Sequence, residues 1–240
     1  MALSQNFKDC FMRITTIQIN GEPFSYQDEI EDITYETISP ISNSEAKELL
    51  ELTQRLFTRK GLKFSLVFGT LLGAVRDKSV ITGDEDVDVF VESEDELRSI
   101  LPFLQQNGLC LCRIYDHKLY SFRASGGKFF IDIYIKRPIS GFWGYWYCYL
   151  CGHILPKRLI SRFSPIAFLG GTYLVPNNPE RFLEFWYGKS WRVPVSGDHS
   201  KHGSTLCDKW QLTRGYTKVR RIWIIIKTII KRLVLGEKIY

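Results

Sequence analysis

The alternation of hydrophobic and polar residues predicts helices and strands along most of this chain. Helical periodicity begins after Ser42 or Ser44, either of which can cap a helix that ends near Gly61. Further helices are expected at 71–76, 94–106 and 179–187, and period-two or apolar runs predict strands at 64–68, 86–91, 109–114, 119–123, 129–135 and 173–175. This order predicts an α+β fold with a mixed β-sheet flanked by helices.

Both ends of the chain differ from this central pattern. Residues 1–40 alternate β-like stretches with acidic ones and predict an N-terminal extension at a sheet edge. Residues 41–212 are expected to form the main domain, and 213–240 a C-terminal amphipathic helix. In that helix, the apolar face includes Trp223 and the opposite face is basic, which suits either an anionic membrane surface or packing on the protein's own core.

Composition and charge narrow the class of protein. The 240 residues are 45% hydrophobic and 24% charged, as in an ordinary globular protein. Of the net charge of +6, residues 214–240 carry +7 and the remainder −1, so a protein-wide nucleic-acid surface is not expected. Six scattered cysteines and an N-terminus without a secretory signal predict reduced thiols and a cytoplasmic location.

Three aspartates form the most informative pattern. Asp86 and Asp88 are two residues apart on one predicted strand, so they share a face while the valines between and after them face the core. Asp132 stands between two isoleucines on another predicted strand and is expected alongside. Neighbouring carboxylates repel unless a cation or a proton intervenes, and such oxygen ligands suit Mg²⁺ or Mn²⁺.

A second pattern precedes these acids. Gly69 and Thr70 stand where a strand turns into a helix, so their backbone N–H groups are expected to bind phosphate. Arg76 follows one to two helical turns later and is expected to clamp phosphate oxygens. Asp84 and Glu85 either support the site or are solvated.

Together, residues 69–76 (GTLLGAVR) and 84–89 (DEDVDV) resemble the LicD family of the nucleotidyltransferase superfamily, which includes phosphocholine transferases and the fukutin-related proteins. Residues 173–180 and 187–194 resemble the end of the same domain. The chain departs from the family pattern at Thr82-Gly83, where Pro-Trp is usual, and at Asp77, where a basic residue is frequent. These departures bear on the choice of acceptor or leaving group.

The resemblance implies an enzyme of the EC 2.7.8 type with Asp86, Asp88 and Asp132 as catalytic metal ligands. It would move phosphocholine or a polyol phosphate from CDP-choline or a CDP-ribitol-like donor to a sugar hydroxyl of a glycan or lipid-linked acceptor. Modification of lipopolysaccharide or capsule, on the inner face of the cell membrane, would fit. The alternatives are a nucleotidyltransferase that releases pyrophosphate and an inactive, membrane-associated binding protein.

Two further clusters each have two interpretations. Cys148, Cys151 and His153 form either half of a zinc site or ordinary free thiols beside a histidine. The aromatic residues between 142 and 149 form either a cage for a quaternary ammonium group or part of a core or interface.

Overall fold

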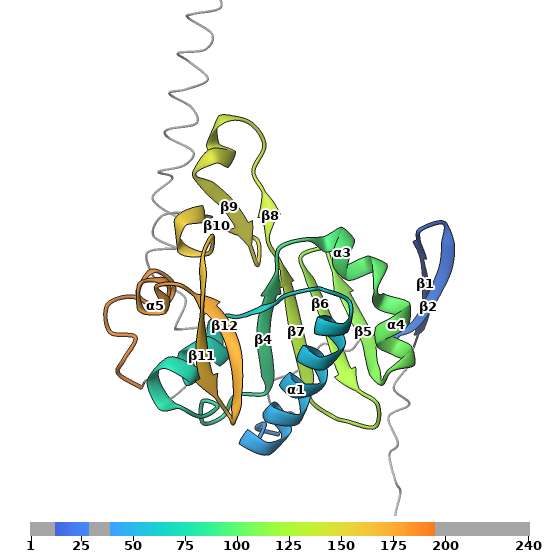
Figure 1. Cartoon of the computed structure of the whole chain (residues 1–240), viewed down its shortest axis with the longest axis horizontal. Helices are drawn as coiled ribbons and strands as arrows, with labels where there is room; N and C mark the ends of the chain where they lie inside the picture. The colour runs from blue at the N-terminus through green and yellow to red at the C-terminus, as the bar shows by residue number, and fades with distance from the viewer. Residues whose placement is uncertain (1–12, 29–38, 195–240) are drawn as a thin grey trace, which may run out of the picture. The chain divides into compact units, whose positions relative to one another are not determined.

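The computed structural model describes residues 13–28 and 39–194, and its compact parts divide between Phe182 and Leu183. The first part contains a seven-stranded sheet (Figure 1). In spatial order its strands are β11 (Phe163–Phe168), β12 (Gly171–Pro176), β3 (Ser65–Leu66), β4 (Asp86–Val91), β7 (Phe130–Ile135), β6 (Leu119–Ala124) and β5 (Leu109–Tyr115). The β12–β3 and β4–β7 pairs are parallel and the others antiparallel, which confirms the predicted mixed sheet.

Helices cover one face of this sheet. They are α1 (Asn43–Arg59), α3 (Glu94–Ser99) and α4 (Leu101–Gln106), drawn on the same side of the strands in Figure 1. Tyr120 of β6 marks this face, since its hydroxyl donates to Glu94 Oε1 at 2.6 Å and accepts from Arg98 at 3.2 Å. By strand alternation and register, the fully buried Val87, Val89, Ile131 and Ile133 share the face of Tyr120. The aspartates of β4 and β7 therefore point to the opposite face.

Local sequence explains where the helices begin and end. Ser42 caps α1 and forms a capping box with Glu45. The sequence predicts either Ser42 or Ser44 as this cap. The helix predicted as continuous from 94 to 106 is instead two helices that meet at Ile100. Pro102 explains the break, because it has no N–H to donate to the preceding turn.

The segment between β3 and β4 differs from the prediction. The strand expected at 64–68 ends at Leu66, and α2 (Phe68–Leu72) begins earlier than the helix expected at 71–76. It continues into a π-helical turn, η1 (Gly73–Asp77). The chain turns from strand to helix at Phe68, directly before Gly69 and Thr70, the residues predicted to bind phosphate.

The N-terminal extension forms the hairpin β1 (Arg13–Ile19) and β2 (Glu22–Asp28), which lies beside β5. Arg98 Nη2 donates to the carbonyl of Gln18 at 3.0 Å, and Gln105 donates to that of Ser25 at 3.4 Å. The described part of the extension thus lies beside β5, the edge strand of the main sheet.

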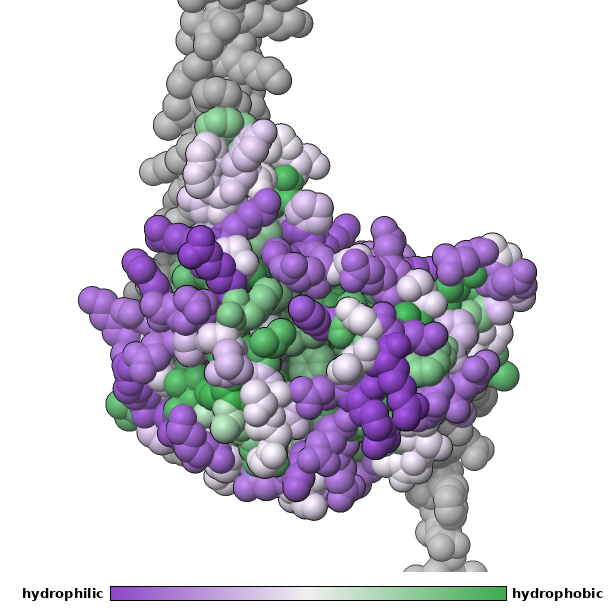
Figure 2. All heavy atoms as spheres, viewed as in Figure 1, coloured by the Kyte–Doolittle hydropathy of each residue, from purple (hydrophilic) through white to green (hydrophobic). Residues whose placement is uncertain are grey.

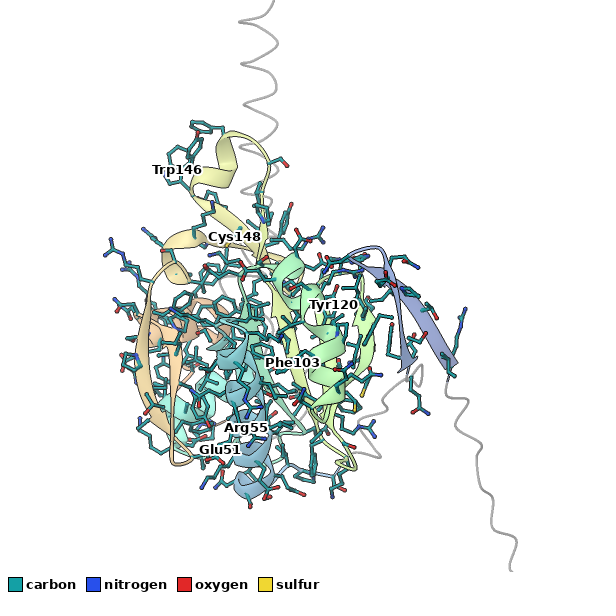
Figure 3. All side chains as sticks on the ribbon, turned by 45° about the vertical axis from the view of Figure 1, so that its right-hand side comes forward. Glu51, Arg55, Phe103, Tyr120, Trp146 and Cys148 are labelled. Atoms are coloured by element: carbon teal, nitrogen blue, oxygen red, sulfur yellow. The ribbon has the colours of Figure 1, made fainter. Side chains whose placement is uncertain are left out.

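After β7 the chain leaves the main sheet and forms a second sheet of three strands. Its order is β10 (His153–Pro156), β9 (Tyr147–Leu150) and β8 (Arg137–Pro138), with η2 (Phe142–Tyr145) before β9 and η3 (Lys157–Leu159) after β10. We call residues 136–160 the arm. Trp146 lies at its outer end and Cys148 nearer its base (Figure 3), and the same outer end is pale and green in Figure 2.

The last described helix is α5 (Pro179–Tyr187), which ends before Gly188 as predicted. The predicted C-terminal helix at 213–240 and the boundary at 212 lie outside the described residues. Among residues 13–28 and 39–194, no helix is both long and apolar enough to cross a lipid bilayer.

Candidate active site

The structure brings the three predicted carboxylates together on one face of the sheet. Asp88 and Asp132 are direct partners in the parallel β4–β7 ladder, and Asp86 precedes Asp88 by two residues on the same face. Asp88 is 7% exposed and Asp132 is 6% exposed. The sheet therefore holds adjacent carboxylates in a nearly buried position.

Burial and mutual repulsion disfavour the charged forms of these groups. Burial first, then the charges of Asp88 and Asp132, raises the pKa of Asp86 well above its ordinary value. The pKa of Asp88 is raised well above its ordinary value by burial, then by Asp84 and Asp132, against opposing hydrogen bonds from Gly69 and Tyr134. The site therefore carries more negative charge than its surroundings balance.

A divalent cation would balance the negative charge of these carboxylates. All three candidate ligands are carboxylates, the oxygen donors that Mg²⁺ and Mn²⁺ prefer. Within the described residues, Oδ1 of Asp132 is buried without a hydrogen-bond partner. No three acidic, histidine or cysteine side chains in this part of the chain already converge as a complete ligand set, so a cation would have to draw the carboxylates closer together.

A polar row that the sequence did not disclose supports Asp132. Arg113 of β5, Ser121 of β6 and Asp132 of β7 are successive register partners across the sheet. Arg113 Nη2 donates to Ser121 Oγ at 3.1 Å, and the fully buried Ser121 hydrogen-bonds the Asp132 carboxyl. Burial raises the pKa of Asp132, while Ser121 and Arg113 oppose the increase. This row orients and partly neutralises the third carboxylate.

The strand-to-helix turn is tied to β4 at two points. Gly69 N donates to Asp88 Oδ2 at 2.9 Å, and Asp88 N donates to Thr70 Oγ1 at 2.7 Å. Thr70 is 3% exposed, so its hydroxyl holds β4 in place. Phosphate binding by Gly69 and Thr70 stays a prediction, and in this structure the Gly69 N–H is directed at a carboxylate.

The space around Gly69 is tight. A Cβ atom at this position would lie 2.9 Å from Asp84 Oδ2 and 3.1 Å from Asp88 Oδ2. Asp84 is therefore part of the site, which decides between the two interpretations that the sequence left open for it.

Phe68 adopts a backbone conformation that is rare for a residue with a side chain. Its φ is +47°, in the left-handed region. Its ring packs edge-on to Tyr134 of β7 at 4.8 Å between centroids and lies 6.3 Å from Phe182. Strain of this kind persists only where the surroundings fix it, and it is frequent at functional sites. These aromatic contacts therefore help to fix the turn that carries Gly69.

Arg76 is held by the residue that follows it. Its Nε donates to Asp77 Oδ1 at 2.8 Å and its Nη2 to Asp77 Oδ2 at 2.7 Å. Asp77 is one of the positions at which the chain departs from the family pattern. Phosphate binding by Arg76 stays a prediction. It would require the guanidinium to leave Asp77, or to bind phosphate and Asp77 at the same time.

The arm contributes Cys151 to the site. The turn Cys151–Gly152 joins β9 to β10, and both residues have positive φ. Burial, followed by the charges of Asp88 and Asp132, raises the pKa of Cys151 to about 12, so this thiol lies near the carboxylates and is protonated. Cys148 is a buried free thiol, and the described residues contain no zinc-type cluster around the pair.

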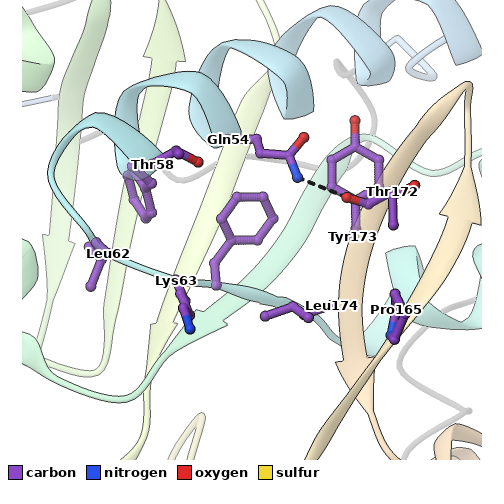
Figure 4. A pocket seen from close by; sticks show the side chains of 10 residues that line it. Gln54, Thr58, Leu62, Lys63, Pro165, Thr172, Tyr173 and Leu174 are labelled. Carbon is purple, nitrogen blue, oxygen red and sulfur yellow. Dashed lines mark hydrogen bonds between the residues drawn. The ribbon is translucent and has the colours of Figure 1, made fainter.

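A separate pocket of about 180 Å³ lies on the helix-covered side of the sheet (Figure 4). Phe57 of α1, Phe64 and Leu174 contribute to its apolar lining, and Gln54 Nε2 donates to the carbonyl of Thr172 at 2.8 Å. The carboxylates face the other side. This pocket is therefore not part of the candidate active site.

We expect Ser121→Ala to weaken Mn²⁺ binding about 10- to 100-fold, because Asp132 loses the partner that orients it. Isothermal titration calorimetry of the purified chain would measure this affinity. Ser125→Ala, on the loop after β6, is the matched control and should bind Mn²⁺ like the parent. Equal affinities for both variants would show that the polar row does not support the site.

The chain has clear relatives. Residues 61–178 match the LicD/FKTN/FKRP nucleotidyltransferase domain. An uncharacterized protein of Rickettsia typhi is 37% identical over 100 residues, which are 40% of this chain and 30% of the relative. A ribitol-5-phosphate transferase FKTN of Homo sapiens is 26% identical over 176 residues, 71% of this chain and 38% of the relative. The chain thus aligns with well under half of the length of these curated relatives.

The matched domain contains the turn at Gly69 and the carboxylates of Asp86, Asp88 and Asp132. The mixed sheet that carries them agrees with the nucleotidyltransferase fold expected from the sequence. On the strength of this match, residues 61–178 form a nucleotidyltransferase domain of the LicD family.

Proposed function

We propose that this chain transfers a phospho-substituent, either phosphocholine or a polyol phosphate, from a CDP-linked donor to a sugar hydroxyl of a glycan or glycolipid. The observation that carries the proposal is the pairing of Asp88 with Asp132, with Asp86 beside them, directly opposite the turn at Gly69. The human relative is named as a ribitol-5-phosphate transferase, which supports a polyol phosphate as the transferred group.

Each residue has a part in this reaction. Asp86 and Asp88 would hold divalent cations, Mg²⁺ or Mn²⁺, which when bound neutralise the donor diphosphate and activate the acceptor hydroxyl. Asp132 would serve either as a further ligand or as the group whose Oδ1 accepts the hydroxyl proton. Gly69 lets the donor phosphates approach the carboxylates closely, and the buried sheet face excludes water around them.

The reaction product tests this proposal against a nucleotidyltransferase. With Mg²⁺ or Mn²⁺, the proposed enzyme releases CMP slowly from CDP-choline or CDP-ribitol even without acceptor, and the active donor identifies the transferred group. A nucleotidyltransferase would instead release pyrophosphate from a nucleoside triphosphate. Turnover of neither CDP donor, in the presence of either metal, would overturn the choice of substrate.

An inactive binding protein of the same fold is the competing class. The raised pKa values of Asp86 and Asp88 mean that keeping both charged destabilises the folded chain. A protein without catalysis has no reason to retain such groups. This favours an enzyme.

We expect Asp77→Asn to lower the KM for the CDP donor several-fold with little change in kcat, because Arg76 would be released from its bidentate partner to bind phosphate. Steady-state kinetics of CMP release would measure both constants. Arg76→Lys should have the opposite effect on KM, since lysine cannot form the forked contact. A higher KM for Asp77→Asn would mean that Asp77 positions Arg76 for the donor.

A further inference from the structure

We propose that the outer end of the arm docks on the surface of an anionic lipid bilayer. The docking surface, which we call the aromatic tip, consists of Phe142, Tyr145 and Trp146. It belongs to the folded domain and is distinct from the predicted C-terminal helix, which lies outside the described residues.

The aromatic tip exposes more apolar surface than its surroundings. Phe142 is 48% exposed, Tyr145 78% and Trp146 52%, and three of the six exposed large hydrophobic residues of the described chain lie here. Their rings touch, with centroids 4.7 Å apart for Phe142 and Trp146 and 6.0 Å apart for Tyr145 and Trp146. A contiguous exposed patch of this kind marks an interaction surface.

The backbone holds the tip in this shape. Gly144 N donates to the carbonyl of Gly141 at 3.0 Å, and Lys157 N donates to that of Trp146 at 2.7 Å. A Cβ atom at Gly144 would lie 1.9 Å from the carbonyl oxygen of Ile139, so only glycine fits. The exposed rings are therefore presented by a specific turn.

Charge around the tip identifies the class of partner. Between Asp132 and Glu180 the sequence contains no acidic residue. The basic residues of that stretch are Arg137, Lys157, Arg158, Arg162 and Lys136, of which Lys136 forms an ion pair with Glu92. Lys157 N donates the hydrogen bond that closes the tip. The next residue, Arg158, is exposed.

Aromatic rings and basic side chains together match an anionic membrane surface. Tryptophan and tyrosine favour the boundary between headgroups and acyl chains, because one part of each ring system is apolar and another is polar. Basic residues are attracted to anionic headgroups over about a Debye length. A soluble acidic protein would satisfy the charges but leave the amphipathic preference of the rings unexplained.

The position of the tip adds a consequence that rests on the proposed function. Strand β9 has the tip at one end and Cys151, whose thiol is influenced by the charges of Asp88 and Asp132, at the other. Four residues of strand span about 13 Å. Docking would therefore hold the active site within a few nanometres of the bilayer, where the sugar of a lipid-linked acceptor is found.

Vesicle sedimentation of the full chain tests the docking. We expect stronger binding to vesicles of phosphatidylcholine with 30% phosphatidylglycerol than to phosphatidylcholine alone. The double variant Tyr145→Ser/Trp146→Ser should bind the anionic vesicles about tenfold more weakly, and Arg158→Glu about fivefold more weakly at low salt. The matched controls Tyr115→Ser and Arg59→Glu, exposed elsewhere on the domain, should bind like the parent.

Unchanged vesicle binding by the tip variants would overturn the proposal, even if the full chain binds lipid through another segment. The proposal would also fail if the tip variants changed only the oligomeric state, or only the binding of a soluble glycan. Donor hydrolysis without vesicles should be the same in the tip variants and the parent. Loss of lipid binding together with absent hydrolysis in every form would uphold docking while refuting the proposed reaction.

Discussion

Asp88→Asn should lower CMP release from the active CDP donor by about 10³-fold or more, because the amide removes the charge that would hold the divalent cations. The side chain keeps its shape, and the Gly69 N–H can still donate to the amide oxygen. The same substitution should raise the midpoint of thermal unfolding in metal-free buffer, since it relieves the repulsion from Asp84 and Asp132. Kinetics and calorimetry of one preparation would measure both effects.

Asp95→Asn is the matched control, because Asp95 is exposed on α3, the helix-covered side of the sheet. It should change neither rate nor stability measurably. An Asp88→Asn protein that is folded and retains donor hydrolysis would exclude Asp88 as a metal ligand. A lower unfolding midpoint would instead show that the hydrogen bond from Gly69 to the Asp88 carboxylate stabilises the fold more than repulsion from Asp84 and Asp132 destabilises it.

Gly69→Ala should lower kcat by about 10²-fold, because the new methyl group would approach two carboxylates at 2.9 and 3.1 Å and force at least one of them away. Displacements of about 1 Å in an active site can have effects of this size. Mn²⁺ affinity should fall as well, since Asp84 and Asp88 both lie against this position. Steady-state kinetics and calorimetric titration would separate the two effects.

Thr70→Ser is the matched control for this substitution. Serine keeps the hydroxyl that accepts from Asp88 N, so its kcat should remain within a few-fold of the parent value. If Gly69→Ala were as active as Thr70→Ser, the side chains of Asp84 and Asp88 would have to move freely. A tight turn would then be unnecessary for catalysis.

Assembly of the candidate site depends on strand order in the sheet. Gly69 and Asp88 are 19 residues apart in the chain, and Asp132 is a further 44 residues away, yet β3, β4 and β7 are consecutive neighbours. The parallel β4–β7 ladder places Asp88 directly beside Asp132. A shift of one residue would turn Asp132 to the helix-covered face.

The sequence by itself predicted the parts of the molecule that local rules govern. The capping box at Ser42, the strand alternation around Asp86 and Asp88, and the helix that starts at Pro179 all follow from spacings of a few residues. Those rules were sufficient for the fold class and for the shared face of two aspartates. Pro102 also gave a local signal for the helix break, which the helical periodicity of its neighbours obscured.

Only the tertiary structure decided what surrounds these residues. Ser121 and Arg113 are separated from Asp132 along the chain, and only the strand register makes them its supports. The left-handed φ of Phe68 depends on the rings packed around it, and a hairpin turn brings Cys151 close enough to feel the charges of Asp88 and Asp132. Periodicity reports which way a side chain faces, whereas its neighbours depend on how distant segments pair, a property that no short stretch of sequence encodes.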